Sequence, residues 1–154
     1  MIDPHPKVKA PARYLAAVSV ALGAFAAGCV TPHRSAVCDV DPFAWSEAAE
    51  IAYANADTLT RYDAALFLRC NGRFAEDTLT VRVATLTPDS LRFVECVCLH
   101  IPDTEHPAAL VREAVIPYRQ RVCLAREGVY RFSVTPIRTV RGVEAAGIHL
   151  TEMH

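Results

Sequence analysis

Apolar and polar residues alternate along most of the chain beyond residue 42, and this pattern predicts β-strands. In residues 61–70 the apolar side chains occupy every second position. The same alternation returns in residues 78–86 and 91–101, with Glu95 as the one interruption. Because side chains two positions apart share a face of a strand, each segment should bury one face and expose the other. Further segments that predict strands are residues 50–54, 115–124, 129–135 and 148–150.

Turn-forming residues separate these segments. Asn71-Gly72 is the strongest turn dipeptide in the chain and suits positive φ angles, and Thr87-Pro88-Asp89 marks the next turn. Pro117 has no backbone N–H to donate, so it places its strand at a sheet edge or at a bulge. About seven short strands without a convincing long helix predict an all-β fold, a β-sandwich of antiparallel sheets that is Ig-like or jelly-roll-like.

The first 28 residues follow a different pattern. Lys7, Lys9 and Arg13 precede an apolar run over residues 14–27, which ends in small residues just before Cys29. The run is shorter than the ~20 residues of a spanning helix, so it predicts an N-terminal signal helix. A cysteine at the cut point resembles the bacterial lipoprotein pattern, in which the thiol receives a diacylglyceryl group with fatty acids such as palmitate. The alternatives are an ordinary signal peptide cut nearby and a plain amphipathic helix.

We therefore predict three parts: a lipoprotein signal peptide at residues 1–28, a lipidated tether at 29–42 and a β-sandwich at 43–154. The tether is expected to be irregular, because residues 30–41 have no apolar period. Phe43 and Trp45 lie two positions apart, so both should face one side and form the first large core residues.

Charge excludes nucleic acid as a partner. The chain has 16 Lys+Arg and 17 Asp+Glu. Three basic residues and Asp3 leave with the signal peptide, so the mature chain keeps 13 arginines, 16 acidic residues and no lysine. A nucleic-acid binder would show a basic patch, whereas these arginines are scattered singly. The predicted partner is instead the lipid bilayer, through acylated Cys29.

The cysteines are the strongest candidates in the sequence for a metal site or a disulfide. Cys96, Cys98 and His100 alternate on one strand face and are zinc-compatible ligand types. A strand rises ~3.3 Å per residue, so Cys96 and His100 stand ~13 Å apart, too far for one ion. We predict no metal and no other cofactor. The alternatives are an ion shared with Cys70 or Cys123, a disulfide among Cys70, Cys96, Cys98 and Cys123, or buried free thiols.

No pattern in the sequence predicts a catalytic residue. The chain has no Gly-x-Ser-x-Gly motif, and His100, His106 and His149 lack a partner nearby in the sequence. Carboxylate pairs of the glycosidase type stay open, because such pairs meet only in the fold. We predict that the protein is not an enzyme.

One short motif recurs in the chain. Asp-Thr-Leu or Asp-Ser-Leu triplets place a hydroxyl at Thr58, Thr78 and Ser90. They resemble acceptor sites for envelope O-glycosylation, which makes these residues candidate modification sites. The alternative is turn chemistry, in which the aspartate closes a loop and the following residues open a strand.

Two stretches of the mature chain carry a family resemblance. In residues 62–88 an alternating strand ends at Arg69 and Asn71, and a second strand runs to Pro88. Residues 128–150 combine Gly-x-Tyr-x-Phe, Arg138 and a Gly-Val…Gly-Ile-x-Leu ending. Together with the lipoprotein signal pattern and the Phe43…Trp45 pair at the start of the predicted domain, these stretches resemble the gliding-motility-associated lipoprotein GldH family. The mature cysteines are not part of that pattern.

The resemblance implies a non-catalytic outer-membrane lipoprotein that belongs to a gliding-motility and secretion-linked machinery. The expected partners are other envelope proteins of that complex. The missing acidic run after Cys29 favours the periplasmic side of the outer membrane. The alternative is a lipid-anchored β-sandwich that binds a small ligand or a glycan and has no motility role.

Overall fold

The computed structural model describes residues 33–102 and 110–153, with backbone alone at residue 33. The predicted signal helix and Cys29 lie outside these ranges. The described residues form eight strands and no helix, so none of them belongs to a helix that could span a membrane. The strands are β1 (His33–Asp39), β2 (Ala49–Asn55), β3 (Arg61–Asn71), β4 (Thr78–Leu86), β5 (Arg92–His100), β6 (Val111–Cys123), β7 (Gly128–Pro136) and β8 (Val143–Glu152).

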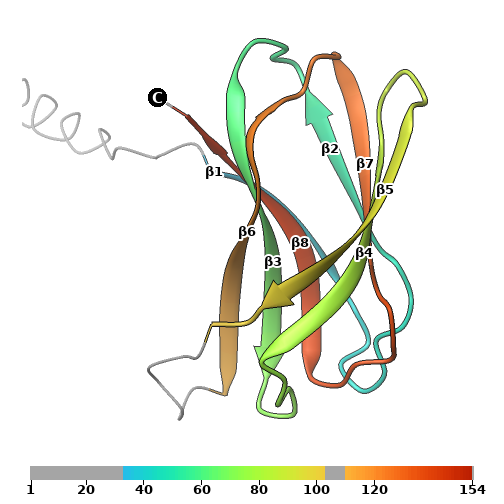
Figure 1. The fold of residues 1–154 in the computed structure, drawn as a ribbon, viewed down its shortest axis with the longest axis vertical. Helices are drawn as coiled ribbons and strands as arrows, with labels where there is room; N and C mark the ends of the chain where they lie inside the picture. Colours follow the sequence, from blue (N-terminus) through green and yellow to red (C-terminus); the bar gives the residue numbers. More distant parts are fainter. Residues whose placement is uncertain (1–32, 103–109, 154) are drawn as a thin grey trace, which may run out of the picture. The chain divides into compact units, whose positions relative to one another are not determined.

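The strands form two four-stranded antiparallel sheets that face each other, which confirms the all-β sandwich (Figure 1). One sheet has the order β1-β8-β3-β6 and the other has the order β2-β7-β4-β5. Each sheet is thus built from pairs nested in the sequence: β1 with β8, β2 with β7, β3 with β6, and β4 with β5.

The core lies between the two sheets. On β3 the side chains of Leu66 and Leu68 are buried, and their neighbours in sequence are only partly covered. On β4 the same alternation buries Val81 and Val83. The period of two in the sequence therefore identified both inner faces correctly, because each sheet has one apolar face to cover.

The predicted tether is wrong for residues 33–39. These residues form β1, which pairs with β8 from His33↔Thr151 to Asp39↔Ala145, so the sandwich begins ten residues before the predicted boundary at residue 43. The segment lacks an apolar period because it is an edge strand whose inner side carries only partly buried residues such as Arg34 and Cys38. Backbone pairing with β8 makes it a strand, and hydrophobic periodicity does not record backbone pairing.

Two local predictions at loops are also corrected. Trp45 is buried and donates its indole N–H to the carbonyl of Glu47, but Phe43 is 61% exposed and lies under the guanidinium of Arg73. The turn at Asn71 exists, since the backbone N–H of Phe74 donates to the carbonyl of Asn71 at 3.0 Å. However, Gly72 does not adopt a positive φ, so the turn is not of the expected mirror-image type.

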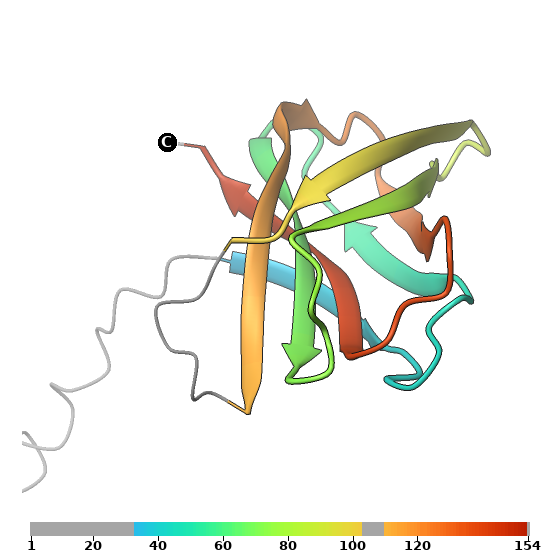
Figure 2. The same ribbon diagram turned by 60° about the horizontal axis from the view of Figure 1, so that its bottom comes forward.

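At one edge of the sandwich, called the open edge below, the end strands β5 and β6 of the two sheets are not hydrogen-bonded to each other. Figures 1 and 2 show β6 at the end of one sheet and β5 at the end of the other. Each of these strands pairs with a single neighbour, β3 or β4. Pro117 therefore does lie on an edge strand, and the ladder between β6 and β3 shifts register beside it, as its sequence position predicted.

Gly147 sets how closely β8 approaches β1. A Cβ atom at this position would lie 2.5 Å from the carbonyl oxygen of Ala36, which is backbone and has little room to move. Gly147→Ala should therefore lower the free energy of unfolding by about 1–3 kcal/mol, the usual effect of overpacking. The measurement is the midpoint of chemical denaturation.

Gly72→Ala is the matched control for this prediction. A Cβ atom at Gly72 meets nothing within 4 Å, so the stability should change by less than about 0.5 kcal/mol. Equal midpoints for both alanine variants would show that the contact between β1 and β8 does not restrict residue 147.

Candidate binding site at the open edge of the sandwich

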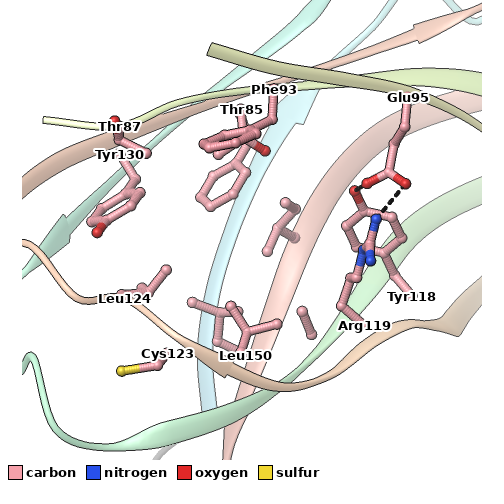
Figure 3. A pocket seen from close by; sticks show the side chains of 14 residues that line it. Thr85, Thr87, Phe93, Glu95, Tyr118, Arg119, Cys123, Leu124, Tyr130 and Leu150 are labelled. Carbon is pink, nitrogen blue, oxygen red and sulfur yellow. Dashed lines mark hydrogen bonds and ion pairs between the residues drawn. The ribbon is translucent and has the colours of Figure 1, made fainter. Parts of the chain in front are cut away.

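A cavity of about 380 Å³ opens between the two sheets near the β5 and β6 edge (Figure 3). Most of its wall is apolar, and both sheets contribute to it. Phe93 lines the cavity and shares the inner face of β5 with the buried Leu99, yet its side chain is 60% exposed. An inward-facing aromatic ring is thus left without a cover at this edge.

A polar bridge crosses from one sheet to the other beside the cavity. Glu95 on β5 accepts hydrogen bonds from two consecutive residues of β6 (Figure 3). The hydroxyl of Tyr118 donates to Oε1, and Nη2 of Arg119 donates to Oε2 at 2.5 Å. The guanidinium of Arg119 also lies 5.6 Å from the centre of the Tyr118 ring. The bridge links the two open edges without a backbone ladder between them.

A bulge in β6 explains why neighbouring residues can point the same way. Successive side chains of a regular strand alternate between faces. Here Arg119 pairs with Ala64 and Pro117 pairs with Ala65, so Tyr118 is an extra residue opposite a continuous partner strand. Such an insertion changes the direction in which the neighbouring side chains point, and it is common at functional sites. It turns both Tyr118 and Arg119 toward Glu95.

The backbone next to the bulge is strained. Arg121 has a φ of 56°, in the left-handed region that costs a non-glycine residue about 1–3 kcal/mol. Its backbone N–H donates to Oδ1 of Asp63 at 3.1 Å, which holds the strand in this conformation. The distorted segment lies directly in the cavity wall, because Arg119 and Val122 both line the cavity.

The bridge moves two pKa values in opposite directions. Hydrogen bonds from Arg119 and Tyr118 hold the pKa of the Glu95 carboxyl below its usual value. Burial, together with the bond to Glu95, raises the pKa of the Tyr118 phenol to about 12. At neutral pH the site therefore presents a carboxylate, a guanidinium and a neutral hydroxyl. General acid–base catalysis needs a pKa near the working pH, and both groups have moved away from it.

The four candidate disulfide cysteines are not brought together. Cys96 and Cys98 are exposed on the outer face of β5, whereas Cys70 is buried on β3. Burial raises the pKa of the Cys70 thiol to about 11. Cys123 lines the cavity at the end of β6. All of these thiols and that of Cys38 are free, so the described residues contain none of the proposed disulfides.

The described histidines and acidic residues do not form a metal site. Over residues 33–102 and 110–153, no group of three or more His, Cys, Asp or Glu side chains could hold an ion. His100 is exposed on the outer face of β5, and His106 lies outside the described residues. His149 is on β8, where Nδ1 lies 2.6 Å from the hydroxyl of Ser35.

The candidate glycosylation sites lie at three separate turns and strand ends. Thr78 and Ser90 are exposed, and Thr58 is partly buried. At the first triplet, Asp57 accepts hydrogen bonds from the hydroxyl and backbone N–H of Thr60 and from the N–H of Leu59. These bonds lower the pKa of Asp57 to about 2. Turn chemistry therefore explains the aspartate of this triplet.

Sequence reasoning overlooked the residues of the bridge. The sequence pattern showed Glu95 only as an interruption of an apolar face, and it assigned no role to Tyr118 or Arg119. The available signal was the combination of a charged residue at an inward strand position with a sheet edge or bulge predicted at Pro117. A charge on the inward face of a strand needs a partner, and a bulge can supply one from another strand.

Glu95 should make the stability of the sandwich depend on pH. Its pKa is lowered in the folded protein, so its contribution is complete above the ordinary value of 4.5 and is lost as the pH falls through the folded value. Glu95→Gln should lower the melting temperature at neutral pH, and the difference from wild type should shrink in acid. Thermal denaturation over a pH series measures this.

Glu113→Gln is the control, because Glu113 pairs with Arg69 on the exposed side of β3 and β6. Glu95 differs because it also accepts a hydrogen bond from the partly buried hydroxyl of Tyr118. An exposed ion pair by itself contributes little, so Glu113→Gln should follow the wild type at every pH. A constant difference between Glu95→Gln and wild type down to strong acid would contradict the role given to the Glu95 carboxylate.

Comparison with known proteins adds no family assignment: no protein-family model and no curated protein matches the chain. The resemblance to GldH lipoproteins therefore stays a prediction from the sequence. What the site can bind therefore follows from its geometry alone, which is a mostly apolar cavity with the Glu95–Arg119 ion pair at its edge.

Proposed function

We propose that this chain is a lipid-anchored, non-catalytic protein of the GldH type that holds binding partners at the outer membrane, on its periplasmic side. The observation that carries this proposal is the signal pattern that ends at Cys29. Its partners are the lipid bilayer and other envelope proteins of a motility or secretion complex, and nucleic acid is not among them.

The candidate site supports a binding role. The polar groups of the bridge have pKa values displaced away from neutrality, which suits permanent charges and hydrogen bonds better than proton transfer. The exposed ring of Phe93 adds apolar surface at the same edge. Exposed apolar surface beside fixed polar groups is typical of binding sites.

The position of β1 changes how the anchor works. Four peptide steps separate Cys29 from His33, and an extended chain spans at most about 14 Å over that length. The lipid would therefore hold the sandwich close to the bilayer surface. Confinement of this kind raises the effective concentration of nearby partners, so a modest interface suffices. Stable anchoring needs more than one acyl chain, which diacylglyceryl modification supplies.

Within the β-sandwich class, we assign the domain to the jelly-roll arrangement and not to the Ig-like one. The nested strand pairs support this assignment, because they describe one long hairpin rolled into two sheets. The assignment carries no function by itself, since one architecture hosts many activities.

Cys29→Ala should abolish lipid attachment, because only the thiol at the cut point accepts the diacylglyceryl group. The measurement is incorporation of an alkyne-labelled palmitate in cells, followed by membrane fractionation. Cys38→Ala is the matched control, since Cys38 lies on β1 and should leave labelling unchanged. If Cys29→Ala still incorporates label and stays in the membrane, the lipoprotein assignment is wrong.

The motility role has a separate test in a gliding host. Deletion of the gene should abolish colony spreading, and a secreted Cys29→Ala copy should not restore it. Full rescue by the unlipidated copy would show that anchoring is irrelevant to the role.

A further inference from the structure

The cavity near the β5 and β6 edge has an apolar wall that solvent reaches. Phe132 and Leu150 are buried at its inner side, whereas Phe93 is 60% exposed at its mouth. Burying a large apolar side chain is worth about 1.5–3 kcal/mol, so this wall favours an apolar occupant. We propose that the cavity binds the hydrocarbon chain of a single-chain amphiphile, whose uncharged head group lies at Arg119 and Tyr118.

The volume limits the size of the occupant. The cavity measures about 380 Å³, near the lower end of the ~300–1,000 Å³ range of small-molecule pockets. A methylene group is similar in size to a water molecule, whose share of liquid volume is about 30 Å³. The space therefore holds about a dozen such groups, which suits one medium-length chain and excludes a two-chain lipid as a whole.

The wall chemistry separates a hydrocarbon chain from a sugar. Thr85, Thr87 and Tyr130 supply the hydroxyl groups of the wall away from the bridge, and the hydroxyl of Tyr130 already accepts a hydrogen bond from the backbone N–H of Arg126. A sugar carries hydroxyls on every side, and each one buried without a partner loses affinity. A hydrocarbon chain has no such requirement.

The bridge fixes the charge of the head group. A guanidinium carries five N–H donors, and the bond to Glu95 uses one of them. The Arg119 side chain is 56% exposed, so its other donors can reach a hydroxyl or an ester oxygen. Glu95 already neutralises Arg119, and a second carboxylate would be repelled by it. An uncharged head group is therefore preferred over an anionic one.

Cys123 provides a reporter for the test, because it lines the cavity, and Cys98 on the outer face of β5 provides an internal reference. The full-length chain in phosphatidylcholine vesicles is treated with N-ethylmaleimide, and alkylation is followed by mass spectrometry. Added 1-decanol should slow alkylation of Cys123 relative to Cys98, whereas glucose should not. This readout is independent of the lipid-labelling and spreading experiments, so either proposal can fail alone.

Phe93→Ala and Val94→Ala form a matched pair, because both side chains are exposed and only Phe93 lines the cavity. Phe93→Ala should raise the decanol concentration needed for protection about tenfold, and Val94→Ala should leave it unchanged. If Cys123 is protected in vesicles before decanol is added, and Phe93→Ala alone removes this protection, the occupant is one chain of a two-chain membrane lipid, and the assignment to a single-chain amphiphile is overturned.

Glu95→Gln tests the head group. Decanol should protect the wild type better than decanoate, and Glu95→Gln should reverse this order because Arg119 is then free to pair with the carboxylate. The proposal is overturned if no ligand slows alkylation of Cys123 relative to Cys98. It is also overturned if Phe93→Ala and Val94→Ala need the same decanol concentration for protection. An unchanged preference in Glu95→Gln would overturn the assignment of the head group.

Discussion

The packing of two apolar sheet faces against each other is the interaction on which this domain depends. Each sheet buries one side of its strands, as Leu66 and Leu68 on β3 and Val81 and Val83 on β4 illustrate. A fully buried aliphatic side chain contributes about 1.5–3 kcal/mol, so the central strands dominate the stability. Nested antiparallel pairs bring these faces together without any parallel crossover.

The same arrangement leaves the outermost strands with less to bury. β1 has one neighbour and only partly covered side chains, so backbone pairing and the close approach at Gly147 hold it in place. At the opposite edge, β5 and β6 lie in different sheets, and the polar bridge of Glu95 joins them. The cavity lies beside this bridge, where the packing of the two faces is incomplete.

The residues that carry the family resemblance include positions that shape the backbone. Gly142 has a φ of 85°, and a Cβ atom there would lie 2.2 Å from the backbone nitrogen of Phe74. Gly128 also has a positive φ. Gly147 allows β8 to approach β1. Glycines at these positions set the backbone geometry and supply no side chain for binding chemistry.

The sequence by itself determined the inner face of each central strand, because side chains two positions apart share a face and the apolar face is the one that is buried. It also placed Pro117 at a sheet edge or a bulge, since the missing N–H is a local fact. Only the tertiary structure made a strand of residues 33–39, where pairing with β8 replaces apolar periodicity. Likewise, it alone placed Glu95 against Tyr118 and Arg119. Those contacts join residues 23 and 24 positions apart in the sequence, on the edge strands of two different sheets. No local pattern in the sequence predicts a contact of that kind.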